Sequence, residues 1–101
     1  MKQEPNYYGI IPAPVLFDDN ISCRSKILYA HIITLTRKEG FCWAQNSYFE
    51  KVMKISQPTL NRAFAELENG GHITRQLIYK PESKEVDMRI IRITDSTYNQ
   101  R

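Results

Sequence analysis

Apolar residues recur at the spacing of an α-helix in three stretches of the chain. The first predicted helix follows Ser22, whose hydroxyl can cap a first helical turn, and ends at Gly40. The third predicted helix spans residues 57–69 and follows a second capping serine, Ser56. Four apolar side chains of this third helix recur at i, i+3, i+4 and i+7 and predict one buried face: Leu60, Ala63, Phe64 and Leu67.

A shorter apolar pattern lies between these two helices. Residues 41–44 are predicted to form a short buried strand or extended plug, with Trp43 as a core anchor. A second helix follows, capped by Asn46 or Ser47. Residues 54–56 then form a tight turn into the third helix, with Ile55 buried in that turn.

The periodicity changes after Gly70 and Gly71, which end the third helix. Residues 73–79 and 86–94 are rich in branched and aromatic residues and predict two strands, joined by the polar, proline-containing loop 80–85. The doubled Ile90-Ile91 leaves open which face of the second strand points inward. We therefore expect an α+β fold, a three-helix bundle with a C-terminal β-hairpin and a short strand between its first two helices.

Residues 1–20 hold three prolines, Pro5, Pro12 and Pro14, and predict an extended, non-helical arm. The arm is also apolar, so we expect it to pack on the domain; a homodimer contact is the alternative. The predicted organisation is therefore an arm over residues 1–20, a domain over residues 21–95 and a polar tail over residues 96–101. The apolar side chains of the arm are Tyr7, Tyr8, Ile10, Ile11, Val15, Leu16 and Phe17.

Composition limits the kinds of protein that this can be. The 101 residues suit one domain, and the net charge of +3 is compatible with a polyanionic partner. No apolar run approaches the roughly 18 residues that span a membrane, and no signal core opens the chain, so we expect a cytoplasmic protein. Cys23, Cys42, His31 and His72 lack the close spacing of a zinc site, and the cysteines are expected to be core or half-buried residues.

The outward face of the third helix carries the candidate chemistry. With the apolar face inward, Gln57 and Asn61 can offer paired amide donors and acceptors to adenine, and Arg62 can bind guanine or a phosphate. Lysines in the 80–85 loop can reach neighbouring phosphates. The predicted DNA-binding residues are Lys54, Ser56, Gln57, Pro58, Thr59, Asn61, Arg62, Lys80 and Lys84.

Two resemblances agree with this interpretation. Residues 54–73, which read KISQPTLNRAFAELENGGHI, resemble the turn, recognition helix and first wing strand of bacterial winged helix-turn-helix proteins. Residues 7–16, 25–30 and 40–44 are similar to the N-terminal domain of phage and plasmid replication initiator proteins. The second resemblance implies recognition of origin DNA and contact with replication proteins.

Other functions remain open from the sequence. A transcriptional repressor is the alternative within the DNA-binding class. A winged-helix adaptor for proteins is the alternative outside it, with Tyr7, Tyr8, Ile10 and Ile11 as the partner surface. No phosphate-binding glycine loop or nucleophile motif is present, so we expect neither an enzyme nor a cofactor.

Overall fold

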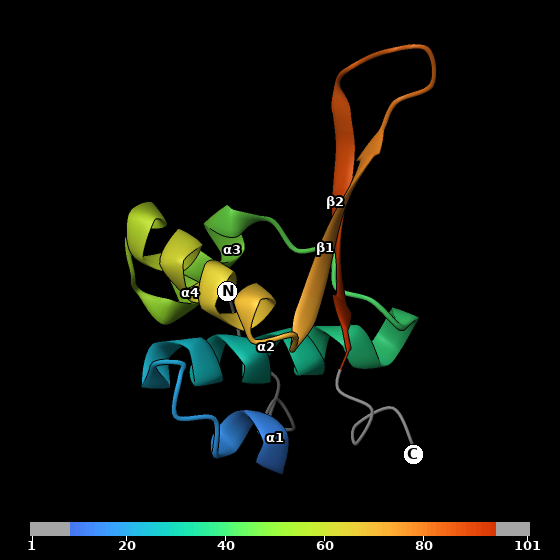
Figure 1. Ribbon diagram of the computed structural model, residues 1–101. Coiled ribbons are helices and arrows are strands. Elements are labelled where there is room, and N and C mark those ends of the chain that lie inside the picture. The colour runs from blue at the N-terminus through green and yellow to red at the C-terminus, as the bar shows by residue number, and fades with distance from the viewer. Residues whose placement is uncertain (1–8, 95–101) are drawn as a thin grey trace.

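The computed structural model describes residues 9–94. Its helices are α1 (Ala13–Leu16), α2 (Cys23–Glu39), α3 (Asn46–Met53) and α4 (Gln57–Asn69), and its strands are β1 (Ile73–Tyr79) and β2 (Val86–Ile93). The helices form a body from which the antiparallel β1–β2 hairpin projects (Figure 1). This confirms the α+β fold class and a winged helix-turn-helix architecture. Within residues 9–94, no helix has both the length and the apolar character needed to cross a membrane.

The boundaries of the two long helices follow from their caps. The Ser22 hydroxyl accepts a hydrogen bond from the amide of Ser25, 3.2 Å away, and Gly40 ends α2 at a φ of 83°. The Ser56 hydroxyl caps α4 in the same way, and Pro58 occupies its first turn. All four apolar residues predicted to face inward on α4 are buried. Both predicted helices are therefore confirmed.

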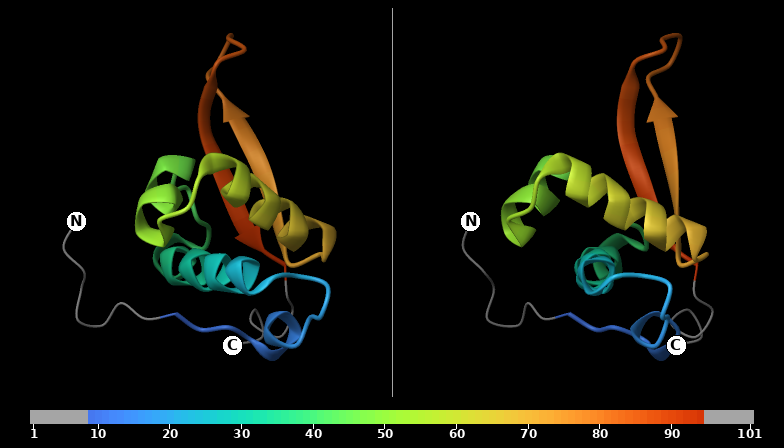
Figure 2. Two further views of the ribbon diagram at one scale, coloured as in Figure 1. Left: turned by 90° about the vertical axis from the view of Figure 1, so that its left-hand side faces the viewer. Right: turned by 60° about the vertical axis from the view of Figure 1, so that its left-hand side comes forward.

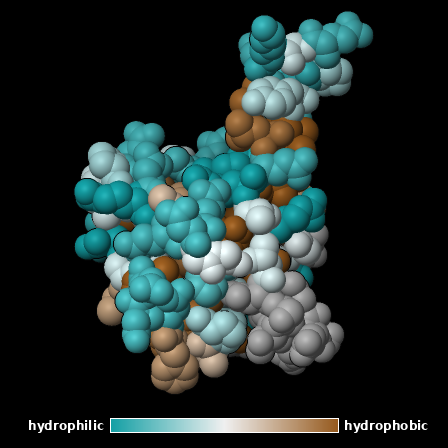
Figure 3. Space-filling model, in the orientation of Figure 1, coloured by the Kyte–Doolittle hydropathy of each residue, from teal (hydrophilic) through white to brown (hydrophobic). Residues whose placement is uncertain are grey.

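The core lies between α2 and α4, which cross one above the other in Figure 2. Helix α2 contributes four fully buried side chains in its middle turns, and the Phe49 ring of α3 meets the Phe64 ring of α4 edge to face at 5.7 Å. The outer surface of α3 and α4 is largely hydrophilic, and a hydrophobic band crosses the hairpin below its tip (Figure 3). The fully buried apolar side chains in these turns of α2 are Leu28, Tyr29, Ile32 and Ile33.

The pairing of the strands shows which face of β2 is inward. Ile91 and Ile93 belong to the core, whereas Ile90 lies on the other face. Ile91 also exchanges two backbone hydrogen bonds with Cys42, at 2.8 and 2.7 Å. The strand predicted over residues 41–44 is therefore reduced to a single β-bridge, Cys42 to Ile91.

The N-terminal segment corrects one prediction. Residues 13–16 form the short helix α1, not the extended arm that the prolines predict. Pro14 lies in the first turn of α1, where its missing N–H removes no helical hydrogen bond. Val15 is fully buried, and Lys26 Nζ donates to the Leu16 carbonyl oxygen at 2.7 Å, which attaches α1 to α2. Tyr7, Tyr8 and the predicted tail over residues 96–101 lie outside the described residues.

Three further predictions are wrong. Trp43 is 54% exposed because the inward-facing Cys42 places its neighbours on the opposite face of the chain. Helix α3 begins at Asn46 after Gln45, with no side-chain cap, since the Asn46 Oδ1 accepts instead from Arg89 Nη1 at 2.5 Å. Cys23 is exposed in the first turn of α2, whereas Cys42 is buried as predicted.

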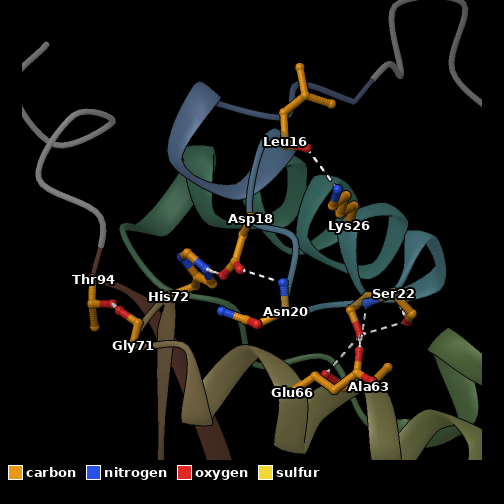
Figure 4. Close-up of polar contacts among 11 residues, drawn as sticks. Leu16, Asp18, Asn20, Ser22, Lys26, Ala63, Glu66, Gly71, His72 and Thr94 are labelled. Atoms are coloured by element: carbon orange, nitrogen blue, oxygen red, sulfur yellow. Dashed lines mark hydrogen bonds and ion pairs between the residues drawn. The ribbon is translucent and has the colours of Figure 1, made fainter.

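A carboxylate of α4 caps the N-terminus of α2. Glu66 Oε1 accepts from the Ser22 amide at 2.9 Å and from the Ser25 hydroxyl at 2.5 Å (Figure 4). These hydrogen bonds, that of Ser25 above all, hold the pKa of Glu66 below its ordinary value of 4.5. An anion at the positive end of a helix is also favourable electrostatically. Glu66 therefore fixes α4 against the first turn of α2.

A second polar contact joins the chain before α2 to the end of α4. Asp18 Oδ2 lies 2.7 Å from Nε2 of His72, which is buried beside Gly71. The hydrogen bond with His72 holds the pKa of Asp18 below its ordinary value. The Thr94 hydroxyl donates to the Gly71 carbonyl oxygen (Figure 4), so the end of β2 is attached to the same corner.

The depressed pKa of Glu66 predicts an acid-sensitive component of stability. A carboxyl with a lowered folded-state pKa stabilises the fold above its ordinary pKa, and the contribution is lost as pH falls through the folded value. At pH 7, Glu66→Gln should lower the free energy of unfolding by about 1 kcal/mol, a modest amount because solvent reaches the carboxylate. Thermal unfolding followed from pH 7 to below about pH 4.5 should show this difference shrink.

Ser25→Ala provides the matched comparison, because it removes the strongest donor to Glu66. Adding Glu66→Gln to Ser25→Ala should cost less than Glu66→Gln costs in the wild type. A cost of Glu66→Gln that stays constant with pH would contradict the assigned role of the carboxylate.

Candidate functional site

The turn between α3 and α4 is closed by a residue in the left-handed conformation. Lys54 has a φ of 57°, and both its amide and that of Ile55 donate to the Glu50 carbonyl oxygen. Ile55 packs partly buried against the core, in agreement with the prediction. The Lys54 side chain itself is exposed. The turn therefore sets the direction of α4 and presents a cation just before it.

Apart from Thr59, the residues predicted to face outward on α4 are exposed. Gln57, Pro58, Asn61, Arg62 and Ala65 are exposed and share the side of the helix opposite its buried residues. Two amides and one guanidinium thus lie together within the first two turns of the helix. Such groups form paired hydrogen bonds with base edges or phosphates.

The remaining two predicted residues at this helix start bind each other. The Ser56 hydroxyl donates to Thr59 Oγ1 at 3.0 Å and accepts from the Thr59 amide at 3.5 Å. Thr59 is half-buried as a result of its position beside the cap. The Ser56 hydroxyl is therefore bound within the helix start, and the exposed face of α4 is formed by its neighbours.

Both carboxylates of α4 are bound to neighbouring elements. Glu66 caps α2, and Glu68 binds the Arg75 guanidinium of β1 through two hydrogen bonds of 2.8 and 2.7 Å. The Arg75 hydrogen bond lowers the pKa of Glu68. The exposed cations near the start of α4 are Lys51, Lys54 and Arg62. The exposed charged side chains around the start of α4 are therefore positive.

The hairpin tip carries the last two predicted residues. Lys80 and Lys84 are both exposed in the 80–85 loop. Lys80 Nζ lies 3.1 Å from Glu85 Oε1, with the side chains 52% and 72% exposed. An exposed ion pair of this kind is weak, so a stronger anion can displace it. The structure places these lysines on the projecting hairpin, apart from the α4 face (Figure 1).

An arginine pair that sequence reasoning missed joins the hairpin to α4. The guanidinium carbons of Arg75 and Arg89 lie 4.7 and 5.0 Å from the centre of the Phe64 ring. Arg89 also donates to Asn46 Oδ1 and, at 2.8 Å, to the Ala44 carbonyl oxygen. Burial lowers the pKa of the Arg89 guanidinium. The sequence signals this pair only by two arginines on predicted strands, and that pattern does not identify Phe64 as their aromatic partner.

The other titratable residues form no metal centre in the described part of the chain. Within residues 9–94, no group of three His, Cys, Asp or Glu side chains could hold an ion. His31 lies half-buried on α2, and its desolvation lowers its pKa.

Comparison with known proteins identifies the segment that contains this site. The sequence model of a family described as helix-turn-helix domain matches residues 19–73, more than half of the chain. The matched segment begins just before α2 and ends at the start of β1. No curated protein and no solved structure shows significant similarity to the chain.

The contacts of Arg89 predict that a lysine cannot replace it. Arg89→Lys keeps the charge but loses the planar fork that reaches both Ala44 and Asn46. The free energy of unfolding should fall by about 1–3 kcal/mol. Chemical denaturation measures this change.

Arg92→Lys is the matched control, because Arg92 is exposed on the same strand. Its cost should stay within about 0.5 kcal/mol. Equal costs for the two substitutions would contradict an anchoring role that is particular to Arg89.

Proposed function

Because the chain belongs to the helix-turn-helix domain family, we propose that it binds double-stranded DNA and recognises a specific sequence. Helix α4 enters the major groove, and the β1–β2 hairpin lies beside it as a wing. One observation carries this proposal. The first two turns of α4 expose two amides and a guanidinium, while the carboxylates of the same helix bind α2 and β1.

The exposed residues of α4 have two roles in this proposal: some bind base edges, and others are compact and allow close approach to the DNA. Arg62 binds guanine or a phosphate, and Gln57 and Asn61 read adenine through their amides. Pro58 and Thr59 are compact and allow the helix to approach the bases closely. Ser56 and Lys54 contribute at the entrance to the helix, Ser56 by capping it and Lys54 as a cation near the phosphates.

The wing adds affinity that does not depend on sequence. Lys80 and Lys84 contact phosphates of the neighbouring backbone, and Lys80 exchanges Glu85 for a phosphate when it does so. Each such contact releases counterions from the DNA, so binding weakens as salt rises.

For the biological role, we propose recognition of an origin in phage or plasmid replication. This assignment rests on the similarity of residues 7–16, 25–30 and 40–44 to replication initiators, and it implies replication proteins as further partners. A transcriptional repressor is the alternative use of the same DNA-binding face. A homodimer through the N-terminal segment would suit either role.

Binding to a pool of random duplexes, measured by fluorescence anisotropy at several salt concentrations, tests the proposal. Micromolar affinity with a log–log salt slope of roughly −4 to −5 is expected for four to six phosphate contacts. The double variant Asn61→Ala/Arg62→Ala should weaken binding about tenfold or more, since it removes an amide and a cation from the exposed face of α4.

A matched variant, Arg24→Ala/Asn69→Ala, loses the same two side-chain types from exposed positions outside the first two turns of α4. It should bind nearly as tightly as the wild type. An absence of binding at low salt by folded protein would overturn the proposal. Polar substitution of Tyr8 and Ile11 would then test the adaptor alternative.

Selection of bound sequences separates the two biological roles. A site that occurs as tandem repeats supports origin recognition. A single palindromic site supports a repressor operator, because the symmetry of an operator mirrors that of a protein dimer.

A further inference from the structure

An apolar groove lies between α2 and the chain that precedes α1. It has a volume of about 300 Å³ and is open to solvent. Its wall on α2 runs from Ile27 to Thr34, two helical turns that span about 10 Å. Ile27, at the start of this wall, is 49% exposed. The residues that line this groove, which we call the α2 groove, are Gly9, Ile11, Ile27, Ala30, His31 and Thr34.

Both walls of the α2 groove are held in place by contacts within the chain. A Cβ atom on Gly9 would lie 2.7 Å from the Ala30 Cβ, well inside the separation of about 3.5–4.0 Å at which carbon atoms attract each other. The absence of a side chain at Gly9 therefore lets this segment touch α2 directly. At the other end of the segment, Lys26 Nζ donates to the Leu16 carbonyl oxygen (Figure 4). The groove is thus formed without a ligand.

The α2 groove and the exposed face of α4 lie on opposite sides of α2. Ile27 and Thr34 are seven residues apart and share one face of the helix, opposite the face that enters the core. Figure 2 shows α4 on one side of α2 and residues 9–16 on the other. A molecule in the groove would therefore not compete with a molecule bound at α4. The core side chains in these turns of α2 are Leu28, Tyr29, Ile32 and Ile33.

The two walls of the α2 groove carry cations and no carboxylate. Residues 9–17 contain no charged residue, and residues 22–38 contain no Asp or Glu. Arg24 lies one turn before the part of α2 that lines the groove, and Arg37 lies one turn after it. Both arginines are exposed. The groove is therefore an apolar surface with a cation near each end.

The carboxylates between the two walls in the sequence do not reverse this charge. Asp18 binds the buried His72, which leaves Asp19 as the exposed acid of the connection between α1 and α2. One carboxylate does not offset the charges of Arg24 and Arg37. The surface around the groove is therefore net positive.

These properties fit an acidic amphipathic helix of another protein. An apolar groove of two turns accepts the ridge that a helix forms with residues i, i+3, i+4 and i+7. Carboxylates on either side of that ridge would meet Arg24 and Arg37, which favours an acidic partner over a basic one. A second copy of α2 would instead bring like charges together. The apolar lining also offers no row of donors for the phosphates of a nucleic acid.

We propose that the α2 groove binds an acidic amphipathic helix of a partner protein, on the side of the domain opposite α4. The apolar ridge of the partner covers Ile27 and Ala30, and its carboxylates pair with Arg24 and Arg37. This interaction goes beyond the proposed DNA binding and does not depend on it. A domain with both surfaces would connect a partner protein to the site that α4 recognises.

A displayed library of helical peptides of about 16 residues tests this assignment. Each peptide carries leucine at i, i+3, i+4 and i+7, and Glu, Lys, Gln or Ala at the other positions. Selection on the full chain should enrich glutamate over lysine one turn beyond each end of the leucine ridge. A selected peptide, followed by fluorescence anisotropy, should bind with about micromolar affinity that weakens as salt rises.

Variants at exposed positions locate the binding site without disturbing the core. Ile27→Gln removes the exposed apolar side chain of the groove and should weaken peptide binding about tenfold or more. Arg24→Glu/Arg37→Glu should weaken it by a similar factor. The matched control Lys51→Glu/Arg62→Glu reverses two exposed cations outside the groove and should bind the peptide within about twofold of wild type.

Each other outcome overturns the proposal. Recovery of no peptide, enrichment of lysine over glutamate, or binding that survives Ile27→Gln would do so directly. A dimer in sedimentation that Ile27→Gln disrupts would assign the groove to a second copy. Peptides recovered only on a chain with Tyr7→Ser/Tyr8→Ser would assign it to the protein's own N-terminal residues. Duplex binding is measured separately, and Ile27→Gln should leave it unchanged, so either proposal can fail alone.

Discussion

The position of α4 depends on the partners of its two carboxylates. Glu66 binds the first turn of α2, and Glu68, two residues later, binds Arg75 on β1. The helix is therefore held from both sides near its C-terminal half, while its N-terminal half presents amides and a guanidinium to solvent. The contact with Arg75 also pairs the negative charge of Glu68 with a cation. These contacts therefore both fix the position of α4 and set the charge around it.

Local signals were sufficient to predict most of the elements. Serine caps and glycine stops predict the limits of α2 and α4, because a capping hydroxyl and the positive φ of Gly40 and Gly71 act within a few residues of the chain. The two strands were found because branched residues cluster in them. The buried side of α4 also determined its exposed side, so the position of Gln57, Asn61 and Arg62 followed from periodicity alone.

Predictions failed where a distant contact decided the outcome. Trp43 is exposed because Cys42 pairs with Ile91, a partner 49 positions later. Asn46 does not cap α3, since Arg89 binds its side chain. Helix α1 was missed because proline was interpreted as a helix breaker, although the first turn of a helix tolerates it. The stacking of Arg75 and Arg89 on Phe64 was likewise invisible to any pattern of nearby residues.

Lys54 closes the turn before α4 in a conformation that ordinarily favours glycine. A side chain in this conformation costs about 1–2 kcal/mol relative to the right-handed helix. A glycine would relieve that strain. It would also raise the conformational entropy of the unfolded chain and remove a positive charge just before α4. The turn thus combines a strained backbone at Lys54 with a defined direction of α4 and a positive charge. In directed evolution for heat resistance, a glycine selected at this position would also remove a charge that the proposed DNA binding uses.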